Sequence, residues 1–310
     1  MSKFHKRRLR GPSSPPLTSA VPFSHYLYIS RVSRTDTALG FWKDYLAGSY
    51  GLTAVPSSTG PVVTNSHSPV NSIQEAIGAL APLSSDITFP TLVNAAIALS
   101  LANLTQADDI TFVCVMSSRD VLTTAASLGP QQADLLLGPC INRTLLRVQL
   151  PEAATNCSAL EFCRRLRSDQ ARVSGEGHLE LTDVVENCTD WLRLSPSAAS
   201  GADQLLKETS FITHLPANTA TLSFSLTEDL GVTWESTDVR IHPENQVFVR
   251  STTSTTTDNE LHACIQVQAS GAVLGEEDAF ALATYILETV QLLSAAPKVL
   301  VRDILHSGEI

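Results

Sequence analysis

The sequence lacks the features that mark several large functional classes. No run of about 18 apolar residues occurs, so we expect no membrane-spanning helix and no membrane partner. The basic N-terminus has no apolar segment behind it and does not look like a secretory signal. The net charge of −10 argues against nucleic-acid binding, because a polyanion requires a basic surface. We therefore expect a soluble, cytoplasmic protein.

Motifs that hold metals or nucleotides are missing as well. The six cysteines are scattered without a C-x-x-C pair, and there is no H-E-x-x-H. The sequence also has no G-x-G-x-x-G, no phosphate-binding loop with Gly-Lys-Ser/Thr, and no G-x-S-x-G. These absences predict no metal site, no cofactor, and thiols that are mostly buried and reduced.

What is present is enough apolar material for a core, since 43% of the 310 residues are hydrophobic. Apolar periodicity predicts helices at 36–48, 90–104, 158–173 and 276–294. Strands are expected at 110–117, 141–150, 221–227, 231–235, 246–251 and 260–269. This order predicts an α/β fold, with one large mixed sheet flanked by helices.

Composition divides the chain into four segments. Residues 1–24 read as a disordered tail rich in Pro and basic residues, either an address for the nucleus or an anionic surface, or a solvated tail. Residues 25–49 carry a Trp-containing helix, which Asp36 can cap and Gly48 can end. Residues 50–84 read as a linker or long loop, and 85–305 as one lobe. Within that lobe, helix 90–104 is apolar on nearly every side and should be buried.

Few side chains stand out as candidates for chemistry. His178 and His214 are the best-placed histidines, and each is either a general base or a hydrogen-bonded structural residue. Arg119 follows the apolar strand 110–117, where it lines a site or forms a structural ion pair. Gly138 belongs to a Gly-Pro turn that brings backbone close to a ligand or is an ordinary turn. Trp191 stacks on a ligand or simply packs.

Several segments together resemble the C-terminal half of a fungal nonribosomal peptide synthetase condensation domain. FWKDYLAGS at 41–49 is similar to the family's Trp-containing segment between the two lobes. The stretch 87–120 resembles its buried helix and following strand, with Ser118 and Arg119 matching and Cys114 in place of a small residue. The stretch 136–148 resembles a Gly-x-x-Val/Ile-Asn-Thr motif that ends in Arg. Its matching positions are Gly138, Ile141, Asn142 and Arg147, while Arg143 replaces the usual Thr.

The resemblance covers about 25–303 and also includes ENCTDW at 186–191. It implies a chloramphenicol-acetyltransferase-like lobe, half of a two-lobed fold that joins acyl and aminoacyl groups carried on phosphopantetheinylated carrier proteins. It places these residues on the acceptor side of the cleft: Ser118, Arg119, Gly138, Asn142, Arg147, His178 and Trp191. The implied partners are carrier proteins and a separate N-terminal lobe.

One departure from the family pattern decides the functional expectation. The family's His-His-x-x-x-Asp-Gly motif, whose second His acts as base or positioning group, occurs nowhere in this sequence. We therefore assign no catalytic residue and expect a partial condensation domain that is inactive alone. The alternative is a non-catalytic remnant or a carrier-docking module. A coenzyme A-dependent acyltransferase of the same fold would also need a His-x-x-x-Asp motif, so the same absence counts against it.

Overall fold

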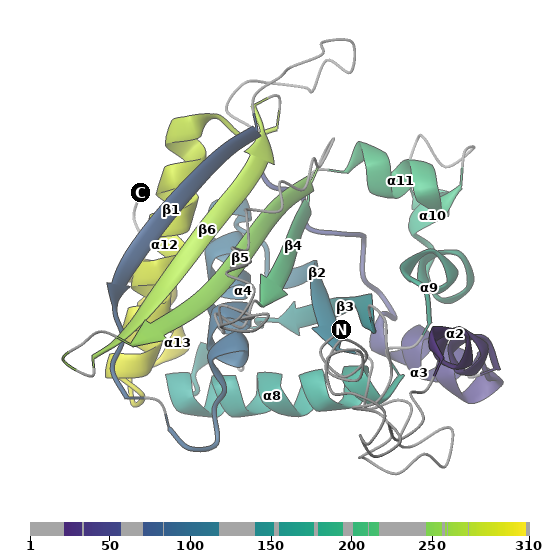
Figure 1. Ribbon diagram of the computed structural model, residues 1–310, viewed down its shortest axis with the longest axis horizontal. Helices are drawn as coiled ribbons and strands as arrows, with labels where there is room; N and C mark the ends of the chain where they lie inside the picture. Colours follow the sequence, from purple (N-terminus) through teal and green to yellow (C-terminus); the bar gives the residue numbers. More distant parts are fainter. Residues whose placement is uncertain are drawn as a thin grey trace, which may run out of the picture.

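A six-stranded mixed sheet organises the fold (Figure 1). The computed structural model describes residues 22–32, 34–56, 71–82, 84–117, 140–151, 155–176, 179–194, 201–209, 211–216, 246–255, 258, 260–271 and 273–307. Its strands run in the spatial order β1-β6-β5-β4-β2-β3 and comprise β1 Asn71–Ala79, β2 Asp109–Ser117, β3 Ile141–Gln149, β4 Phe211–Pro216, β5 Gln246–Thr255 and β6 Leu261–Ser270. Pairing is parallel between β2, β4 and β5 and antiparallel elsewhere, which confirms the mixed sheet.

Helices cover both faces of this sheet. In Figure 1, α4 and α12 lie behind the strands, and α2, α3 and α9 to α11 gather at the right, beside β3. The helices are α2 Phe23–Val32, α3 Asp36–Tyr45, α4 Phe89–Thr105, α8 Ala159–Glu176, α9 Leu181–Cys188, α10 Trp191–Leu194, α11 Ala202–Glu208, α12 Glu276–Ala295 and α13 Val301–Ser307. All four helices expected from the sequence are therefore present. The strands expected at 246–251 and 260–269 are present as β5 and β6.

Alternation along the strands produces two separate cores. Phe112 belongs to the large cluster that includes α4, α8 and α12, whereas the next residue, Val113, belongs to the cluster of α3 and α9 to α11. Ile212 and Phe211 on β4 divide in the same way. Consecutive strand residues point to opposite faces of a sheet. Strand 110–117 therefore has both faces covered, as its apolar sequence predicts.

Helix α4 is among the most buried elements, which confirms the expectation from its apolar surface. Ala95 and Ala98 are 0% exposed, and Leu99 is 1% exposed. The helix begins after Thr88, whose side-chain oxygen accepts a hydrogen bond from the Thr91 amide, with proline in the first turn. It ends at Gln106, which adopts the left-handed conformation with φ of 53°.

We expect Thr88→Ala to lower the free energy of unfolding by about 1 kcal/mol, because an amide at the start of α4 loses its capping acceptor. Urea unfolding measures the change. Thr88→Ser keeps the hydroxyl and is the matched control, with stability close to that of the unchanged protein. Equal stability of the Ala and Ser variants would contradict the capping role.

The start of α8 confirms one predicted cap, and α3 corrects another. Ser158 donates to Glu161 through both its backbone amide and its hydroxyl, and the Glu161 amide donates back to the Ser158 hydroxyl. These bonds form the expected capping box and lower the pKa of Glu161. The cap of α3 is Thr35, which accepts from the Ala38 amide, and not Asp36, which is the first helical residue.

Strand β1 corrects the expectation of a linker. It lies inside 50–84, and Asn71 to Ala79 pair in antiparallel register with Ser270 to His262 of β6. The Ser, Thr, Pro and Gly content of 50–72 suggested a loop, but β1 begins at Asn71, and an edge strand pairs on one side only. Helices α2, α9, α10, α11 and α13 were not expected either. The strands expected at 221–227 and 231–235, and the tail up to residue 21, lie outside the described residues.

Candidate functional site

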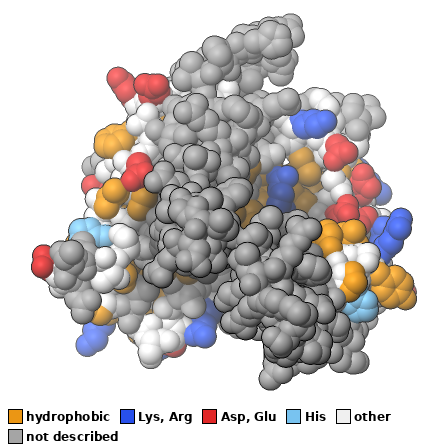
Figure 2. Space-filling view, viewed as in Figure 1, with side chains coloured by type: hydrophobic (Ala, Val, Ile, Leu, Met, Phe, Trp, Pro, Cys, Tyr) orange, Lys and Arg blue, Asp and Glu red, His pale blue; other side chains and the backbone are white. Residues whose placement is uncertain are grey.

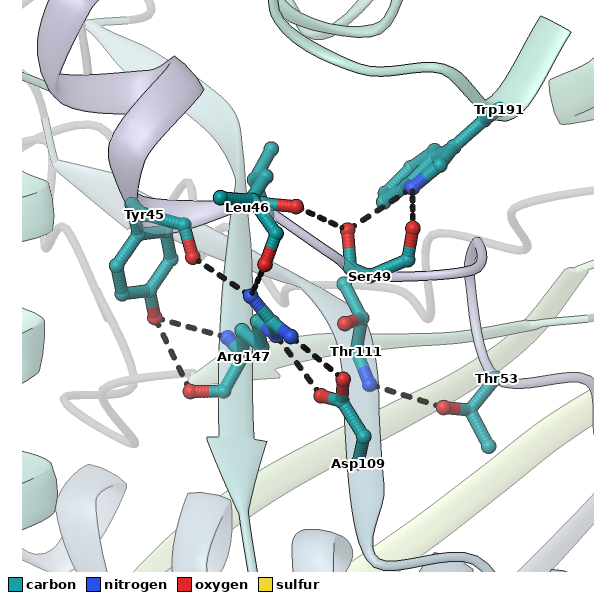
Figure 3. A network of polar contacts seen from close by, with 9 residues as sticks. Tyr45, Leu46, Ser49, Thr53, Asp109, Thr111, Arg147 and Trp191 are labelled. Atoms are coloured by element: carbon teal, nitrogen blue, oxygen red, sulfur yellow. Dashed lines mark hydrogen bonds and ion pairs between the residues drawn. The ribbon is translucent and has the colours of Figure 1, made fainter. Parts of the chain in front are cut away.

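Two of the side chains singled out from the sequence bind the same short segment after α3. The Arg147 guanidinium donates from Nη1 to the carbonyl oxygens of Tyr45 and Ala47, at 3.1 and 2.8 Å. The Trp191 indole donates to the carbonyl and the hydroxyl of Ser49, at 3.1 and 3.0 Å (Figure 3). We call this arrangement the helix-end clasp, comprising Arg147, Trp191 and residues 45–49. It satisfies carbonyl groups that the end of a helix leaves without partners.

An ion pair fixes the clasp to the sheet. Arg147 on β3 donates from Nε and Nη2 to the two carboxylate oxygens of Asp109 on β2, at 2.8 and 2.6 Å. These hydrogen bonds raise the pKa of Arg147. The Tyr45 hydroxyl donates to the Arg147 carbonyl and accepts from its amide, and burial raises the pKa of that tyrosine. Four of the five N–H groups of the guanidinium are thus bound to protein oxygens.

Asn142 also binds backbone. At the start of β3, its Nδ2 donates to the Leu179 carbonyl at 3.0 Å, and its Oδ1 accepts from the Arg143 amide at 2.9 Å. It therefore ties the strand to the segment that leads into α9. The neighbouring Arg143, which stands where the family has Thr, lies with its guanidinium 6.0 Å from the centre of the Phe211 ring.

The contacts of the three described candidates are structural. Arg147 and Trp191 are only 8% and 2% exposed, so neither presents a free polar edge. The other four candidates, Ser118, Arg119, Gly138 and His178, lie outside the described residues. Among the described candidates, Arg147 and Trp191 share the helix-end clasp while Asn142 lies at the other end of β3, and the acceptor-side role of all seven stays a prediction.

His214 forms a sealed polar network in the sheet core. Its Nδ1 lies 2.6 Å from Oδ1 of Asn94 on α4, and its Nε2 lies 2.8 Å from the Ser251 hydroxyl on β5. Since a carbonyl oxygen only accepts, Nδ1 carries the proton and Nε2 accepts from the serine. Burial lowers the pKa of His214 to about 3, and the residue is 0% exposed. Because it cannot reach a substrate, His214 is a hydrogen-bonded structural residue and not a general base.

Sequence reasoning missed a cavity of about 450 Å³ between α3, β3 and α8, which we call the α3–α8 cavity. Phe162 and Leu166 form a buried part of its wall. Its polar and aromatic lining comes from Phe41, Asp44, Tyr45, Arg147, Gln149, Arg165, Asp169 and Arg172. Spacing could have revealed it, because residues 165, 169 and 172 repeat every three or four positions and share one helix face.

Surface charge and ligand-type clusters add little to the site. Over the described residues, no group of three or more His, Cys, Asp or Glu could hold a metal ion. No helix in those same ranges is long and apolar enough to cross a membrane. Acidic, basic and hydrophobic side chains are interspersed at the right of Figure 2. Among the described side chains in that view, Lys and Arg do not gather as a polyanion-binding surface requires.

Comparison with known proteins connects the chain to peptide synthetases. No family model matches it. It is 48% identical over 293 residues to the nonribosomal peptide synthetase asqK of Emericella nidulans, and 50% identical over 279 residues to penN of Penicillium thymicola. These matches cover 93% and 90% of this chain but only 11% and 9% of the synthetases. The chain thus spans about a tenth of the length of the curated relatives it matches.

Solved structures confirm the fold. A crystal structure of a protein called CT matches with a TM-score of 0.68 and 26% identity, over 93% of this chain and 58% of that one. The starter condensation domain of rhizomide synthetase matches with a TM-score of 0.56 at 12% identity, over 90% of this chain and 56% of that one. The helix-flanked sheet is therefore the fold of condensation-domain structures. This confirms the chloramphenicol-acetyltransferase-like lobe expected from the sequence.

Proposed function

Because the chain belongs to the condensation-domain family of fungal nonribosomal peptide synthetases, we propose that it supplies the C-terminal lobe of a condensation domain in secondary metabolism. The observation that carries this proposal is the extent of the structural match. The match covers 93% of this chain but only 58% of the CT chain, and 56% of the starter condensation domain chain, which supports a part of such a domain rather than the whole.

The reaction we propose is amide formation between groups bound to carrier proteins, in the cytoplasm. An amine attacks a thioester carbonyl and loses a proton, while the carrier thiol leaves. The substrates bring their own phosphopantetheine arms, so this chain needs no cofactor. A cytoplasmic location agrees with the six described cysteines, which form no disulfide and five of which are buried.

A separate segment must supply the base. A positioned imidazole contributes about 10²–10⁴-fold to such a step. The sequence has no His-His-x-x-x-Asp-Gly motif, and His214 is sealed in the core. We therefore propose that an N-terminal lobe carrying this motif, on the same polypeptide or another, completes the active centre.

We expect the purified chain alone to form no amide above the no-enzyme rate. The assay mixes it with one donor and one acceptor carrier protein, each loaded, and detects product by mass. Addition of an N-terminal condensation lobe should raise product formation by at least 100-fold. The same lobe with the second motif His replaced by Ala is the control and should not.

Each other outcome selects a different function. Turnover by the chain alone would refute the dependence on a second lobe. Carrier binding without turnover, even after the lobe is added, would favour a docking module. Neither binding nor turnover would favour a non-catalytic remnant.

A further inference from the structure

The α3–α8 cavity has the size and lining of a small-molecule site. Its volume of about 450 Å³ falls within the range of ligand pockets, roughly 300–1,000 Å³. Phe162 and Leu166 are 5% and 3% exposed and give it an apolar floor. The rings of Phe41 and Tyr45 stack at 5.6 Å with an interplanar angle of 10°, and form a flat wall.

Part of the charge in this cavity is already paired. Arg172 forms an ion pair with Asp169 at 3.3 Å, and its guanidinium lies 5.6 Å from the centre of the Phe41 ring. Burial raises the pKa of Asp169, so water is partly excluded from this wall. Arg147 is likewise committed, to Asp109 and to the end of α3. None of these groups needs a ligand.

Two charges of opposite sign remain. Arg165 makes no hydrogen bond or ion pair within the described part of the chain. Its charge acts on the Glu161 carboxylate one turn before it only through space, because that carboxylate accepts the hydrogen bonds of the Ser158 cap. Asp44 lines the same cavity from α3, and its carboxylate has no hydrogen bond or ion pair to a described residue. The cavity therefore offers one cation on α8 and one anion on α3, with an apolar surface between the two helices.

We propose that this cavity binds a small zwitterion with an apolar body, the chemical class of free hydrophobic α-amino acids. The ligand carboxylate pairs with Arg165, its ammonium group pairs with Asp44, and its side chain packs on Phe162 and Leu166. Charge-assisted hydrogen bonds at both ends fix the orientation. Of the described acceptor-side residues expected from the sequence, Arg147 lines this cavity but is held by Asp109, and the proposed site stands independently of amide formation.

Three probes with the same phenyl body test the charge requirement. L-phenylalanine carries both charges, 3-phenylpropionate only the carboxylate, and 2-phenylethylamine only the ammonium group. Isothermal titration and ligand-observed NMR measure their binding to the intact chain at pH 7. We expect L-phenylalanine to bind at least tenfold more tightly than either singly charged probe, because each of those leaves one protein charge unpaired. Equal affinities for all three would overturn the proposal.

Variants at the two uncommitted charges locate the site. Arg165→Gln and Asp44→Asn should each weaken L-phenylalanine binding about tenfold. Arg165→Gln should leave 2-phenylethylamine binding unchanged, and Asp44→Asn should leave 3-phenylpropionate binding unchanged. The matched controls are Arg193→Gln and Asp190→Asn, an exposed ion pair outside the cavity, which should bind like the unchanged protein. Unaltered affinity in both cavity variants would refute the site, and urea unfolding checks that all four variants fold.

Discussion

Arg147→Met should lower the free energy of unfolding by about 3 kcal/mol. The substitution leaves Asp109 without its partner beneath the clasp and removes both hydrogen bonds from the end of α3. Breaking a buried pair by removing one member costs about 3–5 kcal/mol. We place this case at the low end, because the Asp109 side chain is 21% exposed and keeps some contact with water. Urea unfolding followed by circular dichroism measures the loss.

Two further variants separate the clasp from a general effect of charge. Arg147→Lys keeps the charge, but a single ammonium cannot span the carboxylate and two carbonyls, so it should recover less than half of the loss. Arg193→Met removes an arginine whose side chain is 86% exposed in its pair with Asp190, and should change stability by at most about 0.5 kcal/mol. A loss in Arg147→Met no larger than in Arg193→Met would show that the clasp does not stabilise the fold.

Acidification from pH 7 to pH 4 should lower the free energy of unfolding by about 3 kcal/mol through His214 alone. Burial depresses the folded-state pKa of His214 from 6.5 to about 3. Between these values the unfolded chain binds a proton that the folded chain excludes, so stability falls as the pH falls. The slope approaches about 1.4 kcal/mol per pH unit below pH 6. Urea unfolding at pH 7, 6, 5 and 4 measures it.

Two histidine variants test whether His214 causes this dependence of stability on pH. His214→Gln lacks the titrating ring, so its stability, although lower at pH 7, should change far less over this range. His306→Gln alters an exposed histidine and should keep the slope of the unchanged protein. The hydrogen bond from Ser84 lowers the pKa of Asp86 to about 2, so its contribution is lost mainly below about pH 4 and adds little to this slope. Equal slopes in the unchanged protein and in His214→Gln would contradict the assignment.

The parts of the fold that could be predicted are those with local signals. The apolar periodicity of 90–104 and 158–173 and the run at 110–117 depend on neighbours within two turns or one strand, and their elements are present within three residues of the expected bounds. β1 was not predicted because its partner, β6, lies about 190 residues later, and nothing local in its sequence marks an edge strand.

The side-chain contacts were unpredictable for the same reason. Arg147 binds groups 38, 100 and 102 positions away, and His214 binds residues 120 and 37 positions away. The sequence singled out Arg147 through the family resemblance and His214 as one of the two best-placed histidines. Only the folded structure shows that both side chains are buried and form hydrogen bonds within the protein. A resemblance in sequence locates a motif, but it does not show which side of a strand faces solvent.

The pairing of β1 with β6 also sets the order in which this protein can be completed during synthesis. The ribosome must release residue 270 before Asn71 can meet its partner, Ser270. Until then β1 has no partner strand and β5 is paired only with β4, so both present open backbone groups to other chains. Such long-range pairing is slow to form and exposes the chain to aggregation. A nascent chain halted before β6 should therefore require chaperones, whereas one halted after Ser307 should not.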